Sequence, residues 1–503
     1  MAQNLARTSI FVTAILFIGY FIAFAREATI ASYWGVSADV DAYTVAITIP
    51  INLFSIITLS IQSVIIPIYS DHLINHGREY SDRYISLLLN AIIVISLFLI
   101  LVFELLASPI AYLFAPGFSP ESHQLVVSLL RLVIPTILFS LAIYVFTGVL
   151  NVHKSFVWPS ISIYILNLSI IIAIVLLHSK FGIAAACIGQ IIGVILQFTF
   201  LLLFVRKHVK FSLAVNFRDK DIVETGKKVV PVMWSTCLAE VNAIVHRSVA
   251  SLLFVGAIAS LGYAGKINSV LMAFFTSAIA TVVYPLYAES GAKNDYGKLN
   301  SRVNQTLSAY AFFMLPLMIG VLCLRKELVA VAFARGAFDK NAVDITQSIL
   351  GCYAPGLLFL AFRETLTKVF YSLKDTVTPA KNATLGIILN MALSLTLPFI
   401  VGVEGLAIAY SISAAFISMR LMFLLLSKNK EIKLSYLKQN LKKVAIPSVS
   451  MIAGIVALQL LIELPDLYKL VIGLTVGALI YLITSFVFRV PIMLKLFAMV
   501  KKK

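Results

Sequence analysis

Long apolar stretches separated by short polar segments run along the whole chain. Windows of about 20 apolar residues have the length that an α-helix needs to cross the hydrocarbon layer of a bilayer. They begin near Ser9, Ala42, Ile85, Leu125, Val157, Gly182, Val229, Ala257, Thr306, Val343, Thr378, Gly405, Val444 and Leu470. The short alternating segments of a transmembrane barrel do not occur. The pattern therefore predicts an all-α, polytopic membrane protein with about 14 transmembrane helices.

Composition and charge agree with this prediction. Of 503 residues, 60% are hydrophobic and 13% are charged. The net charge of +17 would also fit a nucleic-acid-binding protein, but the basic residues gather in segments that an N-inside topology places in the cytoplasm. The richest segments are Arg206 to Lys228 and Lys428 to Lys443. We interpret both as amphipathic connectors that contact anionic membrane lipids, and we expect no nucleic acid partner.

The chain contains an internal repeat. The motif LFAPGFSPES at residues 113–122 recurs in outline as AFARGAFDKN at residues 332–341. Other pairs follow in the same order: Arg26 with Arg247, Pro67 with Pro285, Pro135 with Pro355, Pro159 with Pro379, Asn167 with Asn390, and Gly182 with Gly405. We therefore predict an N-lobe at residues 1–222 with spans 1–6, a C-lobe at 223–430 with spans 7–12, and two additional spans with a basic tail at 431–503.

Each lobe has an even number of spans, so the two copies should share one orientation in the membrane. Transporters built from parallel repeats bind substrate near the midplane between the repeats. The buried charges are the first candidates, because each costs roughly 2.5–3.5 kcal/mol on insertion scales unless it faces a partner or a wet cavity. The cations in the spans are Arg26, Arg131, Arg247, Lys266, Arg363, Lys368 and Arg420.

Some of these cations have a structural explanation. Glu364 and Lys368 lie four residues apart and can neutralise one another, and Arg131 and Arg420 lie near helix ends. Arg26, Arg247 and Lys266 instead belong to helices expected to line the gap between the lobes. A cavity rich in cations fits an anionic substrate, and a guanidinium fits phosphate oxygens. His246 is a candidate proton relay, or a histidine whose hydrogen bond goes to a backbone carbonyl.

Several segments resemble the MurJ (MviN) family of the multidrug/oligosaccharidyl-lipid/polysaccharide exporter superfamily. They are FAREATIASYWGVSADVDAYTVAITIP, SIQSVIIPIYSD, LFAPGF, LNVHKSFVWPSISIYILN and FYSLKDTVTP. The resemblance extends in order over nearly the whole chain. It implies a flippase that moves an undecaprenyl-diphosphate-linked glycan, the peptidoglycan precursor lipid II, to the outer leaflet. It also implies alternating access of two lobes around a cationic cavity, in the bacterial cytoplasmic (inner) membrane, with both termini cytoplasmic.

The resemblance also implies site residues. The family's arginine–aspartate pair in the first span corresponds to Arg26 and Glu27, and its aspartate before the second span to Asp41. The arginine of its YADR motif corresponds to Lys266, which keeps the charge and loses the two-pronged donor. Arg247 and Asn167 complete the substrate-binding candidates.

Other positions depart from the family. The first arginine of the family's SRxxGF motif is Tyr20 here, and the charged residues of its second span are replaced. Where some members place a sodium-binding aspartate, this chain has His246. Asn390 keeps an amide, and Ser394 stands in place of a nearby acid of the family, so these three residues are the candidates for coupling. We therefore expect the membrane potential, and not a sodium gradient, to drive transport.

Three alternatives stay open from the sequence. A flippase for an exopolysaccharide or O-antigen repeat unit would use the same diphosphate carrier. A drug or cation antiporter of the same superfamily would favour acidic residues in its cavity. A membrane glycan polymerase would be an enzyme, but the outer loops are too short for one. We expect no enzymatic activity, no cofactor and a monomer. We also expect no metal, because the four cysteines lack metal-ligand spacing.

Overall fold

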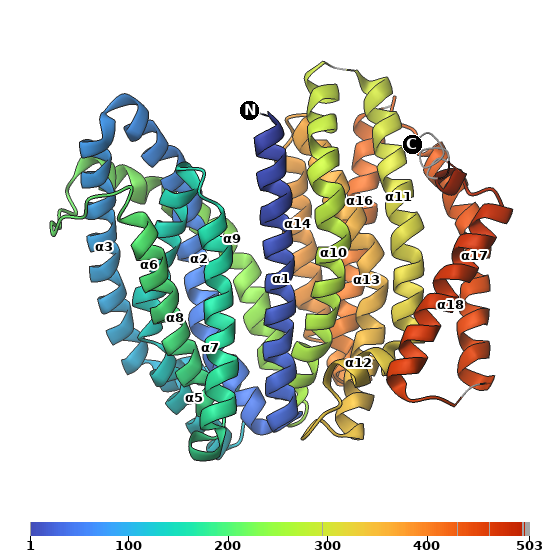
Figure 1. The fold of residues 1–503 in the computed structure, drawn as a ribbon, viewed down its shortest axis with the longest axis horizontal. Coiled ribbons are helices and arrows are strands. Elements are labelled where there is room, and N and C mark those ends of the chain that lie inside the picture. Colours follow the sequence, from blue (N-terminus) through green and yellow to red (C-terminus); the bar gives the residue numbers. More distant parts are fainter. Residues whose placement is uncertain (1, 294, 430, 462, 495–496, 498–503) are drawn as a thin grey trace. The chain divides into compact units, whose positions relative to one another are not determined.

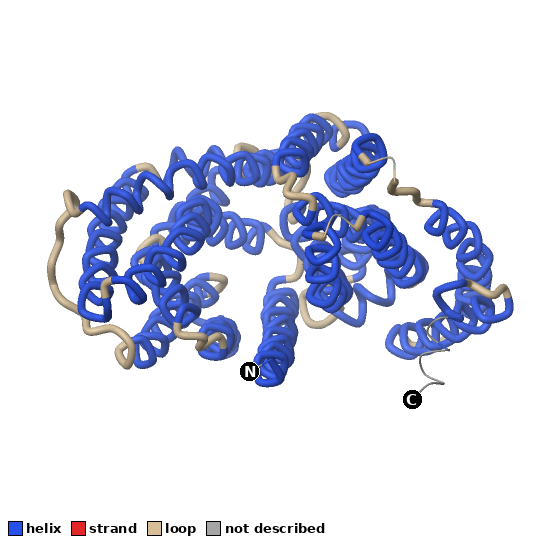
Figure 2. Tube along the Cα trace, turned by 90° about the horizontal axis from the view of Figure 1, so that it is seen from above, coloured by secondary structure: helices blue, strands red, loops and turns tan. Residues whose placement is uncertain are grey.

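The computed structural model describes residues 2–293, 295–429, 431–461, 463–494 and 497 (Figure 1). The description of side chains does not extend to residues 2–13, 53–56, 58–63, 231–232, 234–236 and 274–282. All elements in the described ranges are helices joined by turns and loops, and no strand occurs among them (Figure 2). The prediction of an all-α protein is confirmed.

The chain forms two compact units, Met1–Ala259 and Ser260–Lys503. Unit 1 holds α1 (Ala2–Trp34), α2 (Ala38–Asn75), α3 (Gly77–Leu105), α4 (Ala107–Phe114), α5 (Pro120–Val133), α6 (Thr136–Val152), α7 (Val157–Phe181), α8 (Ala184–Val205) and α9 (Lys220–Ser251). Unit 2 holds most of α10 (Ala257–Ala292), then α11 (Tyr296–Cys323), α12 (Arg325–Phe333), α13 (Lys340–Ser372), α14 (Val377–Ser394), α15 (Pro398–Val401), α16 (Glu404–Lys428), α17 (Ser435–Leu461) and α18 (Asp466–Val487). The repeat-based lobe boundaries remain a prediction.

The helices have the lengths and apolarity of membrane spans. Among the described residues, 10 helices meet both requirements, and α5 and α6, bent by 48° at Pro135, make an eleventh span when taken together. A proline ring removes a helical hydrogen bond, which accounts for the bend. The other three predicted spans coincide with α2, α9 and α10, which have 38, 32 and 36 residues. The protein is a polytopic helical membrane protein.

Small residues set the packing of the inner helices of unit 1. A Cβ atom built on Gly189 of α8 would lie 2.7 Å from Cα of Ile170 on α7. One built on Gly193 would lie 3.0 Å from Cα of Leu166. Glycine therefore allows the α7 and α8 backbones to touch, as small residues do between helices in lipid. Helix α6 packs against α8, and α1 packs against α7.

The backbone repeats along with the sequence. Lys154 and Lys374, each five residues before a paired proline, have positive φ angles of 58° and 60°, which is uncommon outside glycine. Gly182 and Gly402 also have positive φ angles, and each lies two residues before the start of a long helix, α8 or α16. The structural counterpart of Gly182 is therefore Gly402, and the sequence pairing with Gly405 was wrong by three residues.

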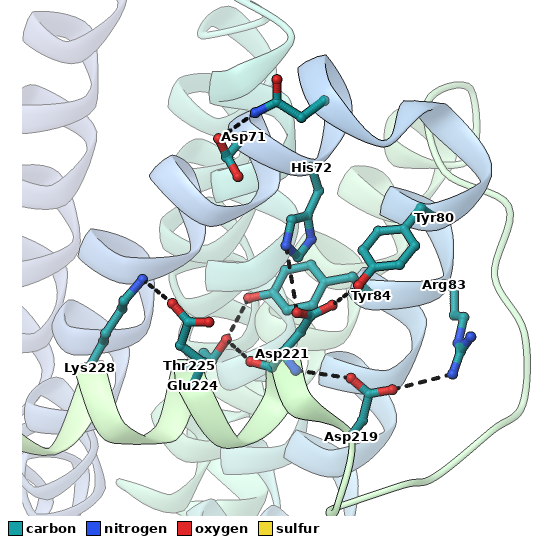
Figure 3. Close-up of polar contacts among 11 residues, drawn as sticks. Asp71, His72, Tyr80, Arg83, Tyr84, Asp219, Asp221, Glu224, Thr225 and Lys228 are labelled. Atoms are coloured by element: carbon teal, nitrogen blue, oxygen red, sulfur yellow. Dashed lines mark hydrogen bonds and ion pairs between the residues drawn. The ribbon is translucent and has the colours of Figure 1, made fainter.

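Helix α9 is tied to unit 1 at its first turns (Figure 3). The hydroxyl of Tyr80 donates a hydrogen bond of 2.6 Å to Asp221 Oδ2, and the hydroxyls of Tyr84 and Thr225 lie 2.9 Å apart. Arg83 Nη2 lies 3.3 Å from Asp219 Oδ2. The tyrosines and the arginine come from α3, so α9 packs with the first unit although the repeat places it in the second lobe.

The far end of α9 is held as well. Ser248 Oγ donates a 2.7 Å hydrogen bond to the carbonyl of Leu113, and the N–H of Gly117 donates to Ser251 Oγ at 3.2 Å. Leu113 and Gly117 belong to the repeated LFAPGF motif between α4 and α5. The motif therefore holds the C-terminal end of α9 through these two hydrogen bonds.

In unit 2, the motif FYSLKDTVTP joins α13 to α14. Asp375 Oδ2 accepts hydrogen bonds of 2.7 Å from Lys428 Nζ and from Thr378 Oγ1. The hydrogen bond from Lys428 holds the pKa of Asp375 at about 2.

The two additional C-terminal helices also belong to unit 2. Helix α17 packs against α11 and α18, and Tyr481 of α18 donates a 2.8 Å hydrogen bond to the carbonyl of Phe312 on α11.

Candidate substrate site

Arg26 and Glu27 form an ion pair on α1. Arg26 Nη2 donates to Glu27 Oε1, and the two side chains are 18% and 22% exposed. The Arg26 Nε atom is buried and has no hydrogen-bond partner among the described residues. A guanidinium carries five N–H donors, so the pair leaves donors of Arg26 for a second anion. Glu27 can orient the arginine without consuming all its hydrogen-bonding capacity.

Asp41 has a different environment from Arg26. It lies in the first turn of α2 and is only 1% exposed. Its Oδ2 atom accepts a 2.6 Å hydrogen bond from the N–H of Gly256, and Oδ1 accepts one of 2.7 Å from the N–H of Ala259. A carboxylate at the first N–H groups of a helix satisfies donors that the helix leaves open. Asp41 therefore holds the start of α10, and its place in substrate binding stays a prediction.

The remaining candidates of unit 1 lie on α7 and α9. Asn167 is 4% exposed, and its Nδ2 atom donates a 2.9 Å hydrogen bond to the Ile163 carbonyl, whereas its Oδ1 atom has no partner in the described part of the chain. Arg247 Nη1 donates to the carbonyl of Ala243 at 3.3 Å, and the neighbouring His246 is half-buried. Arg247 therefore combines this backbone contact with an electrostatic interaction with the Glu240 carboxylate.

Unit 2 contributes Lys266, Asn390 and Ser394. Lys266 lies half-buried on α10. Asn390 and Ser394 are buried on α14, four residues apart, and Asn390 Nδ2 and Ser394 Oγ make no hydrogen bond with any described residue. Residues four apart lie on one face of a helix. Asn390 and Ser394 therefore form a small buried polar pair whose Nδ2 and Oγ atoms have no partner among the described residues.

Three other cations in the spans have protein partners. Arg131 Nε lies 3.6 Å from Glu104 Oε2, and Arg420 Nη1 donates a 2.8 Å hydrogen bond to Asn382 Oδ1. Arg363 Nη2 donates to Glu364 Oε1 at 2.8 Å. Glu364 thus pairs with the preceding arginine, where the spacing had indicated Lys368. These contacts indicate structural roles for Arg131, Arg363 and Arg420.

The structure also contains a cavity that the positions of charged residues in the sequence do not indicate. It has a volume of about 540 Å³ and lies inside unit 1, between α1, α2, α6, α7 and α8. Its polar lining consists of hydroxyl and amide side chains: Thr136, Ser140, Tyr144, Thr147, Asn151, Ser160, Ser162, Gln190 and Gln197. The signal in the sequence is the spacing of Ser140, Tyr144, Thr147 and Asn151. Steps of four, three and four place them on one face of an otherwise apolar helix.

Comparisons with known proteins agree on one family. The family model described as lipid II flippase MurJ matches residues 30–462. The lipid II flippase MurJ of Thermosipho africanus is 28% identical over 486 residues, which is 96% of each chain. The probable lipid II flippase MurJ of Rickettsia prowazekii is 27% identical over 422 residues, or 82% of each chain.

Solved structures give the same result. A lipid II flippase MurJ in an inward closed conformation superposes with a TM-score of 0.83 and 27% identity, covering 95% of this chain and 98% of that one. An inward-facing multidrug resistance MATE family transporter of the MOP superfamily has a TM-score of 0.68 and 14% identity, covering 84% and 96%. That second likeness shows the fold alone. Because the family model matches most of its length, the chain belongs to the lipid II flippase MurJ family.

Proposed function

We propose that this protein is a transporter, not an enzyme, that moves lipid II from the cytoplasmic to the outer leaflet of the bacterial inner membrane. The observation that carries the proposal is family membership over most of the chain, together with relatives named lipid II flippases. Lipid II is an undecaprenyl-diphosphate-linked glycan. Its diphosphate needs cationic donors, and Arg26 has a buried donor for which the described residues offer no partner.

We assign roles on this basis. Arg26 and Lys266 bind the diphosphate, Glu27 orients Arg26, and Arg247 adds a second arginine from unit 1. Asn167 offers an amide to the substrate, and Asp41 supports the site by fixing the start of α10. Transport proceeds by alternating access, as in transporters built from repeats. Both termini face the cytoplasm, the protein acts as a monomer, and its basic connectors contact anionic lipids.

The proposed function predicts rescue of a bacterial strain depleted of its own lipid II flippase. Expression of this protein should restore growth and cell shape, because lipid II export would resume. Growth and membrane levels of the protein should be measured together. Failure to rescue with normal membrane levels would contradict lipid II as the substrate and favour an exopolysaccharide or O-antigen repeat unit.

The driving force gives a further prediction. An inside-negative potential moves a diphosphate outward, with about 2.3 kcal/mol per charge per 100 mV. An ionophore that collapses the potential should slow lipid II export severalfold, whereas replacing sodium with potassium should have little effect. The reason is that His246, Asn390 and Ser394 present no carboxylate to a sodium ion. Export of lipid II from cells should be followed under both treatments, and strict dependence on sodium would contradict this part of the proposal.

A further inference from the structure

The uncharged cavity of unit 1 has the features of a binding site. It lies in the half of the bundle next to the α6–α7 connection, because its lining includes Asn151 near the end of α6 and Phe156 just before α7. Its volume of about 540 Å³ falls within the range of small-molecule pockets, roughly 300–1,000 Å³. Under the N-inside topology this half of the bundle is the cytoplasmic half, where a lipid carrier would enter.

Part of the polar lining is already used by the protein. Thr136 Oγ1 donates a 2.6 Å hydrogen bond to the Val133 carbonyl, and Ser160 Oγ donates one of 2.9 Å to the Phe156 carbonyl. Gln197 Nε2 donates to Ser162 Oγ at 3.1 Å. Bonds of this kind are the ordinary way in which hydroxyls and amides are satisfied inside helical bundles.

The other polar side chains are not used in this way. In the described part of the chain, five of them line the cavity and make no hydrogen bond with another protein group: Ser140, Tyr144, Thr147, Asn151 and Gln190. Four come from one face of α6 and the fifth from α8. Polar groups in such a place need partners, because unpaired polar groups at membrane depth are costly. The missing partners should come from a bound molecule or from water.

The chemistry of the lining selects among the parts of a lipid-linked glycan. A diphosphate would need cations, and the described residues that line the cavity include no Lys, Arg, His, Asp or Glu. A polyprenyl chain would leave the hydroxyls and amides unpaired. A neutral sugar offers hydroxyls and acetamido groups that both donate and accept, as the side chains of Asn151 and Gln190 do. Its apolar ring face can lie against Tyr144 or Phe156.

We propose that this cavity binds an uncharged sugar of the N-acetylhexosamine class, the glycan part of the transported lipid. The inference rests on the proposed function and extends it, because it separates recognition of the glycan from recognition of the diphosphate. Asn151 and Gln190 form hydrogen bonds with the sugar and act as specificity-determining residues. Arg26 is not needed for this recognition.

The test compares two lipids on the purified full-length protein. Binding of lipid II and of undecaprenyl diphosphate, which has no sugar, is measured by native mass spectrometry. The double variant Asn151→Leu/Gln190→Leu removes both amides at similar volume. Thr199→Val is the matched control, since Thr199 is exposed on α8 and bonds to its own helix at the Ile195 carbonyl.

The wild type and the control should bind lipid II more tightly than undecaprenyl diphosphate. The double variant should lose about tenfold or more in lipid II affinity, the effect of two lost hydrogen bonds, and keep its affinity for undecaprenyl diphosphate. Unchanged lipid II binding in the double variant would overturn the inference. An equal loss of affinity for both lipids would also overturn the inference, because the cavity would then have a structural role or bind the polyprenyl chain that both lipids share.

A result in which the wild type binds neither lipid would refute the proposed function and not this inference. The inference is then decided by thermal unfolding with the soluble sugar N,N′-diacetylchitobiose at millimolar concentration. Stabilisation of the wild type and not of the double variant would support the sugar site. Equal melting curves with and without the sugar would refute it.

Discussion

Arg26→Ala is expected to abolish lipid II transport while the protein still reaches the membrane. The variant removes the guanidinium whose Nε atom bonds to no residue in the described part of the chain. Hydrogen bonds to charged groups contribute about 1.5–3 kcal/mol each, about tenfold or more per bond, so the loss of several donors at once should reduce transport to background. Rescue of a flippase-depleted strain and membrane levels of the protein measure the two effects separately.

Two further variants separate substrate binding from helix pairing. Arg26→Lys keeps the charge and loses the planar fork, so it should retain part of the activity. If the ion pair only held helices together, Arg26→Ala would lower membrane levels, and the double variant Arg26→Ala/Glu27→Ala would restore transport. Recovery of transport in that double variant would contradict the substrate role of Arg26.

Transport should depend on a positive charge at Lys266, as it does at Arg26. Lys266→Arg should be tolerated, since it keeps the cation and adds the planar fork of donors that fits two phosphate oxygens, and Lys266→Glu should be inactive through repulsion of the phosphates. Normal transport by Lys266→Glu at normal membrane levels would exclude Lys266 from the diphosphate site.

Asp41→Ala is expected to destabilise the protein strongly. The substitution leaves the buried N–H groups of Gly256 and Ala259 without their acceptor, at about 1–3 kcal/mol for each unpaired group. Asp41→Asn should have a smaller effect, because its amide keeps one acceptor oxygen. The melting temperature of the purified protein in detergent measures both.

The same turn offers a variant that changes no charge. Gly256 has a φ of 95°, and a Cβ atom there would lie 2.4 Å from Val36 Cγ1, so Gly256→Ala should lower the melting temperature as Asp41→Ala does. Gly262→Ala is the matched control, since a Cβ atom at Gly262 would have no atom of a described residue within 4 Å. A fully stable Asp41→Ala protein that fails to transport would instead place Asp41 at the substrate.

The helical membrane fold could be predicted because its signal is local. Runs of about 20 apolar residues define a span whatever their neighbours, so the positions of α3, α7 or α18 follow from the sequence. The sequence pairing of Pro159 with Pro379 agrees with a backbone feature of the structure, since Lys154 and Lys374, each five residues earlier, both have positive φ angles. The place of α9 could not be predicted in this way, because its attachment to unit 1 depends on contacts with residues more than 100 positions away, such as Tyr80 with Asp221.

Candidate site residues could be named from the sequence only where they carry charge. A cation in an apolar span is conspicuous, so the sequence analysis named Arg26 and Lys266 as candidates, and their binding role stays a prediction. The capping role of Asp41 depends on a turn more than 200 residues later, at Gly256, and no local pattern reveals it. The neutral cavity was missed because serine, threonine and asparagine are common in membrane helices and usually bond to their own backbone. Only the structure distinguishes Thr136, whose hydroxyl bonds to the Val133 carbonyl, from Thr147, whose hydroxyl bonds to no other described residue.

The most direct measurement of the central claim is lipid II transfer between leaflets in proteoliposomes. Vesicles containing the purified wild-type protein and fluorescent lipid II should show transfer that a membrane potential accelerates. Vesicles with equal amounts of Arg26→Ala should show the rate of protein-free vesicles. Equal transfer rates for the wild type and Arg26→Ala, or no transfer by a wild-type protein that is folded and inserted, would contradict the account.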